Sequence, residues 1–269
     1  MAQRESRSPI VPIVALLLLA VVAGDLARRA VLRPAAPPGA APSPRAAPGV
    51  PDSAPGRMIA AAGAGSLAAA VAVTAPLDAA TRTAVLQRIE RDGADTYLPA
   101  MLASGDSTLH RWGDDRRSRP VRVAVLRDAV PGFHDMFVAN VGWAITQWNA
   151  VGLPIYLEQV ADTAGADIVL TWADRLDSNR AGRADVTWER GGSFVHVHIT
   201  LATHAPDGRQ VSPPEMVALA LHELGHALGL GHSPVAADAL HPETSALDLT
   251  ARDRRTALLL YALPPGSLR

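Results

Sequence analysis

The chain has 269 residues, of which 48% are apolar, and its formal net charge is −1. So weak a net charge gives no indication of the strongly basic surface that is typical of nucleic-acid-binding proteins, so no nucleic-acid partner is expected. Cysteine is absent, which excludes disulfides, thiolate metal sites and cysteine nucleophiles. A metal site in this chain would have to be built from His, Asp or Glu side chains.

Residues 1–33 predict a signal peptide or an N-terminal membrane anchor with its flank. Arg4 and Arg7 precede an apolar run, Ile10–Ala23. This run fits the core of a signal peptide better than the roughly 20 residues of a spanning helix. Cleavage after Ala23 and a retained anchor both stay open, because arginines just beyond the run weaken the orientation signal. In either case we expect the folded part outside the cytoplasm, either extracellular or periplasmic, or attached to the membrane.

Changes of composition divide the remaining chain into three parts. Residues 34–56 are rich in Pro and Ala without an apolar period, which predicts a linker. Residues 57–118 are interpreted as a small pro-like or accessory region, with a helix that is capped at Asp78 and ends near Gly93. Residues 119–269 show the mixture of strand and helix patterns that is typical of an α/β (α+β) domain.

The elements beyond residue 118 are predicted in the order strand, helix, strand, strand, helix. Val121–Leu126 alternates as a strand does, and residues 133–151 carry apolar side chains at helical spacing. Ala166–Trp172 and Ser193–Leu201 read as two further strands. This order predicts a mixed sheet.

The stretch "SPPEMVALALHELGHALG" predicts a helix with a well-marked beginning. Ser212 can cap the helix, and Glu215, three residues later, completes a capping box. Successive residues of a helix lie 100° apart around its axis. His222 and His226 are four residues apart, so they share a face that lies opposite a row of apolar side chains.

Gly229 permits a sharp turn after this helix, and the turn can bring His232 back toward His222 and His226. Three neutral imidazoles leave one position of a tetrahedral site open, which is typical of a catalytic zinc ion. Glu223 would lie beside the metal without binding it. A carboxylate in that place can act as general base and then general acid, taking a proton from a metal-activated water and passing it to the leaving amine. The pattern therefore predicts peptide-bond hydrolysis with one catalytic Zn²⁺.

The stretch "HELGHALGLGHS" matches HExxHxxGxxH, the zinc signature of the metzincin clan of metallopeptidases, and looks most like the matrixins. The resemblance extends over about 119–266. "VGWAITQWNAVG" is similar to a matrixin helix with a late Trp, and "GADIVLTW" to the strand that follows it. "LTARDRRTALLLYALPPG" looks like the C-terminal helix of the family.

The resemblance implies a zinc-dependent endopeptidase that acts on extended polypeptides. It implies a metzincin-like catalytic domain, of the matrix-metalloprotease type, with a mixed twisted sheet, a zinc-binding active-site helix and a C-terminal helix. The strand Ser193–Leu201 is then expected to be the sheet edge that pairs with the substrate through Val195, Val197 and Ile199. Neither structural calcium nor a second zinc ion is predicted.

The chain departs from the family pattern after the zinc helix. Matrixins have a methionine-containing turn that ends in Pro, and "DALHP" aligns with it, with Leu240 in place of the methionine and Pro242 at the end. The turn supports the ligands from beneath, and apolar swaps of similar volume usually cost under ~1.5 kcal/mol. Many matrixins are kept latent by a propeptide cysteine, a mechanism that the absence of cysteine excludes here.

Two other functions stay open at this point. A zinc-binding, non-catalytic module of the cell envelope would keep the histidines. Leu240 favours that alternative, whereas the presence of Glu223 argues against it. A structural protein of the cell envelope, held by its N-terminal anchor, would bind its partners with or without zinc. Neither the natural substrate nor the oligomeric state follows from the sequence.

Overall fold

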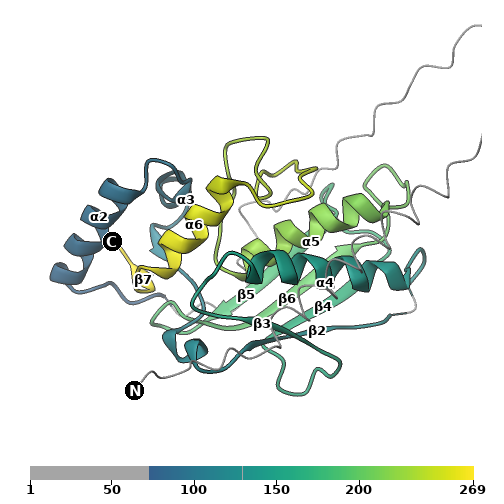
Figure 1. The fold of residues 1–269 in the computed structure, drawn as a ribbon, viewed down its shortest axis with the longest axis horizontal. Helices are drawn as coiled ribbons and strands as arrows, with labels where there is room; N and C mark the ends of the chain where they lie inside the picture. The colour runs from purple at the N-terminus through teal and green to yellow at the C-terminus, as the bar shows by residue number, and fades with distance from the viewer. Residues whose placement is uncertain (1–72, 129) are drawn as a thin grey trace, which may run out of the picture. The chain divides into compact units, whose positions relative to one another are not determined.

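The structure is a computed structural model of the chain, and it describes residues 73–128 and 130–269 (Figure 1). These residues belong to one unit of the chain, Ala54–Arg269. The predicted signal or anchor, the linker and the first part of the predicted accessory region lie outside the described residues. Within the described ranges, no helix is both long enough and apolar enough to cross a membrane.

A five-stranded mixed sheet forms the centre of the fold. Its strands are β2 (Val121–Val125), β3 (Leu157–Val160), β4 (Ile168–Ala173), β5 (Gly182–Trp188) and β6 (Phe194–Ala202). They lie in the order β3-β2-β4-β6-β5, in which β5 is antiparallel to β6 and the other neighbours are parallel. The α/β fold class with a mixed sheet is confirmed. Three of the observed strands, β2, β4 and β6, correspond to strands predicted from the sequence.

The prediction that the strand Ser193–Leu201 forms the sheet edge is wrong. Strand β6 pairs with β4 over Val197–Ala202 and with β5 along its other side. Val197 and Ile199 are fully buried there, and their backbones face β4 on one side and β5 on the other. The edge next to β6 is β5, which the sequence pattern did not predict, because "GRADVTW" mixes Gly and Asp with strand-forming residues.

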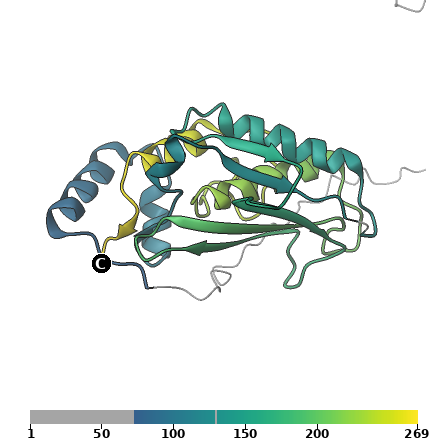
Figure 2. The same ribbon diagram turned by 90° about the horizontal axis from the view of Figure 1, so that it is seen from below.

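Helices α4 (Asp135–Asn149) and α5 (Pro213–Ala227) pack against each other on one face of the sheet (Figures 1 and 2). The predicted apolar face of α4 is buried, and its Trp148 indole donates a hydrogen bond of 3.0 Å to the carbonyl of Leu221 in α5. The predicted capping box of α5 is present, since Glu215 accepts a hydrogen bond of 2.8 Å from the Ser212 amide. These contacts fix α5 above the sheet.

The described residues before 119 pack against the last helix and strand of the fold. Helix α2 (Ala79–Asp92) begins after Asp78 and ends before Gly93, as predicted. It is followed by α3 (Leu98–Ser104), the short strand β1 (Thr108–Leu109) and the 3₁₀ helix η1 (Asp114–Arg117). Strand β1 pairs antiparallel with β7 (Gly266–Ser267), which follows the C-terminal helix α6 (Ala251–Tyr261). The domain boundary at residue 119 stays a prediction.

Candidate metal centre and active site

The structure brings together the three histidines that the sequence predicts as metal ligands. His222 and His226 lie one turn apart on α5, with their Nε2 atoms 3.0 Å from each other. The ring of His232 lies 5.3 Å from that of His222 and 4.9 Å from that of His226, measured between centroids. One nitrogen of each ring lies within 4.8 Å of the other two. Such a group can hold a metal ion.

The turn that returns His232 depends on Gly229. Its φ is +100°, a value that residues with a side chain rarely adopt. A β-carbon at this position would also lie under 3.0 Å from the carbonyl oxygen of His110. The amide of Leu230 donates back to the carbonyl of Gly225, at 3.0 Å. Both the backbone conformation and the lack of space therefore require glycine here.

Backbone carbonyls orient two of the imidazoles. Nδ1 of His222 lies 2.8 Å from the carbonyl oxygen of Ala239, and Nδ1 of His226 lies 2.7 Å from that of Leu230. Because a carbonyl only accepts, each Nδ1 carries the proton and leaves its Nε2 with a free lone pair. Nε2 of His232 is buried and has no hydrogen-bond partner among the described residues. The donor set thus fits a divalent metal ion that favours imidazole.

Burial also favours the neutral form of these rings. It lowers the pKa of His222 well below its ordinary value, with a further lowering from His226 and His232. Burial, followed by the nearby His226, lowers the pKa of His232 to about 3. Neutral imidazoles are the form in which histidine binds a metal.

Glu223 lies fully buried beside this group. Neither of its carboxylate oxygens has a hydrogen-bond partner among the residues that the structure describes. Burial is the main cause that raises the pKa of Glu223 to about 8; Asp185 raises it further and Arg180 opposes the rise. The carboxylate contacts Gly182, where a β-carbon would lie under 3.0 Å from Oε1. A buried carboxylate without a partner is costly unless a cation or a proton compensates it.

The turn beneath the histidines contains Leu240. Its side chain is buried against α5, where a β-carbon on Gly225 would lie 2.8 Å from Cδ2 of Leu240. The Leu240 carbonyl accepts a hydrogen bond of 2.9 Å from the Ser233 amide, next to His232. Pro242 follows two residues later and is partly exposed.

Sequence reasoning missed Asp253, which supports the group formed by His222, His226 and His232. This buried carboxylate accepts hydrogen bonds from the amides of Ala239, at 3.0 Å, and Thr250, at 2.9 Å. Ala239 is the residue whose carbonyl orients His222. The signal was present in the sequence, because Thr250 and Asp253 have the spacing of a capping box at the start of α6.

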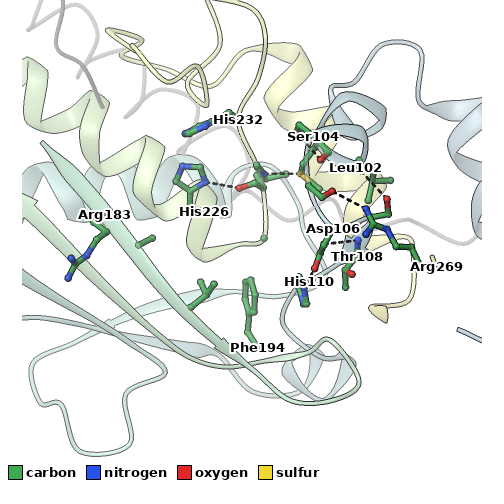
Figure 3. A pocket seen from close by; sticks show the side chains of 18 residues that line it. Leu102, Ser104, Asp106, Thr108, His110, Arg183, Phe194, His226, His232 and Arg269 are labelled. Carbon is green, nitrogen blue, oxygen red and sulfur yellow. Dashed lines mark hydrogen bonds and ion pairs between the residues drawn. The ribbon is translucent and has the colours of Figure 1, made fainter. Parts of the chain in front are cut away.

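The three residues predicted to bind substrate differ in their exposure to solvent. Val195 is 54% exposed, whereas Val197 and Ile199 are fully buried. A cavity of about 590 Å³, which the sequence did not predict, lies beside His226 and His232 (Figure 3). Strand β5 adjoins both features, because Gly182 lies against Glu223 and Val186 lines the cavity.

Comparison with known proteins agrees with this geometry. Residues 134–262 match the family model of the matrixins. The chain is 29% identical over 135 residues to Metalloendoproteinase 1-MMP of Arabidopsis thaliana, and this alignment covers 45% of the chain and 37% of that protein. The chain thus spans about a third of the length of this relative. The described fold, the histidine group and these similarities support a matrixin-like metzincin catalytic domain in this chain.

Proposed function

We propose that the protein is a zinc-dependent endopeptidase that hydrolyses peptide bonds in extended polypeptides. The observation that carries this proposal is the histidine group, in which three ring nitrogens lie within 4.8 Å of one another, with the buried Glu223 beside it. A zinc ion bound by His222, His226 and His232 would lower the pKa of water and polarise the carbonyl of the scissile bond.

The chain itself supplies proton transfer through Glu223. Neither of its oxygens has a partner among the described residues, so either one can accept the proton of the attacking water. The same carboxyl group then delivers the proton to the amine nitrogen that leaves. Gly182 leaves room for the carboxylate at the start of β5, which keeps the proton acceptor next to the strand that would hold the substrate.

Polypeptides would bind along β5 by strand addition. Strand β5 ends the order of the sheet, so one side of its backbone is unpaired with any other strand of the described residues. An extended peptide can form main-chain hydrogen bonds with such an edge, and neighbouring cavities then select its side chains. This role replaces the one that the sequence assigned to Val195, Val197 and Ile199.

We also propose that the catalytic domain works outside the cytoplasm. The support is the apolar run Ile10–Ala23, preceded by Arg4 and Arg7. The run would direct export and would then be cleaved off or kept as a membrane anchor. Fractionation of cells with and without residues 1–33, followed by detection of the chain, tests this proposal, and cytoplasmic retention of the full chain would contradict it.

Replacement of the general base tests the endopeptidase proposal. Glu223→Gln should lower the rate of cleavage of an unfolded protein such as casein by about 10²–10⁴-fold, while zinc content stays near one ion per chain. Glu90→Gln changes an exposed glutamate of α2 and is the matched control. Unchanged cleavage by the Glu223 variant would contradict the mechanism. Wild-type protein that holds zinc but cleaves nothing would instead favour a non-catalytic binding module.

A further inference from the structure

The cavity beside the metal group has walls from four parts of the chain that are distant in sequence (Figure 3). One wall comes from α3 and the loop that follows it, another from β5 and the start of β6. The turn between His226 and His232 and the C-terminal residue complete it. Its apolar and aromatic lining includes Met101, Leu102, His110, Val186, Phe194 and Leu230.

The wall from the N-terminal segment is held firmly in place. Its strand β1 pairs with β7. Nε of Arg111 donates a hydrogen bond of 2.9 Å to the carbonyl of Leu263. The indole of Trp112, which is fully buried, donates one of 2.9 Å to the carbonyl of Ala227, the last residue of α5. Removing this segment would expose a buried tryptophan and leave these carbonyls without partners.

The same segment also touches the turn between the predicted ligands. The amide of Gly231 lies 2.8 Å from Sδ of Met101, and a β-carbon at Gly231 would lie under 3.0 Å from the Met101 side chain. Gly231 immediately precedes His232. His226 and His232 themselves line the cavity, so the cavity adjoins the histidine group.

The interior of the cavity favours an apolar occupant. The ring of His110 lies 4.2 Å from that of Trp188 and 6.4 Å from that of Phe194. Burial lowers the pKa of His110, against an opposing effect of Asp106, which favours the uncharged form of this lining ring. Charged groups line the cavity from more exposed positions. One of them is Arg183, whose Nε lies 2.8 Å from Oδ2 of Asp185. Apolar side chains gain roughly 1.5–3 kcal/mol on full burial.

The position of the cavity along β5 relates it to the cleaved bond. Gly182 contacts Glu223, whereas Ala184 and Val186, two and four residues further along β5, line the cavity. A strand advances about 3.3 Å per residue. A peptide paired with β5 would therefore place side chains two to four residues from the cleaved bond at the mouth of the cavity.

We propose that this cavity is a substrate subsite for a large apolar side chain, two to four residues from the cleaved bond, and that residues 97–110 are a permanent part of the catalytic unit. This inference rests on the proposed endopeptidase function. Of the two interpretations of residues 57–118, pro-like or accessory, it favours an accessory region that is kept, because the described part of that region builds a wall of the site.

The test compares two arginine substitutions on the full chain loaded with zinc. Leu102→Arg places a charge in the cavity, whereas Leu86→Arg places one on α2, where Leu86 is 50% exposed and is not part of the lining. Cleavage of a peptide library randomised on both sides of the cleaved bond gives the preference at each position. We expect Leu102→Arg to lower kcat/KM at least about tenfold for peptides with Leu or Phe at one such position. For peptides with Ala at that position, kcat/KM of Leu102→Arg should change less than about twofold. The Leu86 variant should change kcat/KM less than about twofold for every peptide.

A second variant keeps the test decisive where Leu102→Arg fails to fold. Leu102→Trp fills the cavity without a charge and should shift the preference at the same position toward smaller side chains. An identical preference in wild type and both variants would overturn the subsite.

N-terminal sequencing of the active exported protein should find residues 97–110 retained, and an active form that begins beyond Trp112 would overturn their permanent role. Zinc-loaded wild type that cleaves no peptide would overturn the proposed function itself, whereas cleavage without any preference would overturn the subsite alone.

Discussion

Gly182 faces the carboxylate of Glu223 so closely that a β-carbon at position 182 would lie under 3.0 Å from Oε1 and from Cδ. The glycine belongs to β5 and the glutamate to α5. The sheet edge and the active-site helix therefore meet at a point where only a hydrogen atom fits. The position of the proposed general base depends on this contact.

Gly182→Ala should accordingly reduce catalysis more than metal binding. The added methyl group displaces Glu223 or the start of β5, and a displacement of about 1 Å in an active site can cost about 10²-fold in rate. Measurement of kcat and zinc content would show a large fall in the first and little change in the second. Gly191→Ala is the matched control, because a β-carbon there meets its nearest atom at 3.8 Å. An unchanged kcat for Gly182→Ala would contradict the role given to this contact.

Gly229→Ala should weaken metal binding. The substitution places a side chain at a φ of +100° and against the carbonyl of His110, so the turn must move and carry His232 away from the other rings. Strain of this kind costs of the order of 1–3 kcal/mol, equivalent to a loss of roughly 5- to 150-fold in affinity. Competition with a chromophoric chelator measures the zinc affinity. Gly152→Ala has a comparable positive φ, +80°, but open space around it, so equal losses in both variants would argue against the proposed cause.

Asp253→Ala should lower both the free energy of unfolding and the zinc affinity. It leaves the buried amides of Ala239 and Thr250 without their acceptor, at a cost of about 1–3 kcal/mol. It also frees the backbone that orients His222. Denaturant unfolding in the presence of a chelator isolates the first effect, and chelator competition measures the second. Asp248→Ala removes an exposed partner of Arg254 and should change unfolding by less than about 1 kcal/mol.

Leu240 offers a graded test of the turn beneath the ligands. Leu240→Met restores the residue type of the resembled family and should change stability by less than about 1.5 kcal/mol. Leu240→Ala opens a cavity against Gly225 and should cost about 2–5 kcal/mol. Calorimetric unfolding of both variants with and without zinc makes the comparison. A strong gain in zinc affinity for Leu240→Met would show that leucine is a defect of this turn.

Removal of the metal should lower the midpoint of thermal unfolding. An ion that binds only the folded chain stabilises it by about 4 kcal/mol at a free concentration a thousandfold above its dissociation constant. Dialysis against a chelator, followed by return of zinc, should lower and then restore the midpoint. Replacement of His232 by Ala should abolish most of this difference, while replacement of the exposed His134 should not. Equal shifts in both variants would place the metal elsewhere.

The sequence predicted the parts of the fold that local patterns determine. The capping residues Asp78 and Ser212 and the apolar faces of α4 and α5 mark helices by themselves. The spacing of His222 and His226 on one helix, followed by Gly229, was enough to predict the histidine group. Local sequence carries this information because caps, periodicity and turn glycines act over a few residues.

Features that arise from distant contacts were not predictable in this way. Strand β5 has a weak strand pattern and is stabilised by pairing with β6, so the edge of the sheet was misplaced. The support given by Asp253 depends on its contact with Ala239, and the cavity depends on Met101 meeting Gly231. Such contacts follow from tertiary packing, which overrides local propensity and leaves no periodic signal.

The pairing of β1 with β7 also sets an order of events during folding. Thr108 pairs with Ser267, so the two strands close a loop that contains the whole five-stranded sheet. Contacts so distant in sequence form later than the local hydrogen bonds of a helix, because a long loop must be closed first. Met101 and His110 would therefore take their places beside the histidines late, after α4 and α5 have formed. A partly folded chain would hold the histidines of α5 while its cleft was still unfinished.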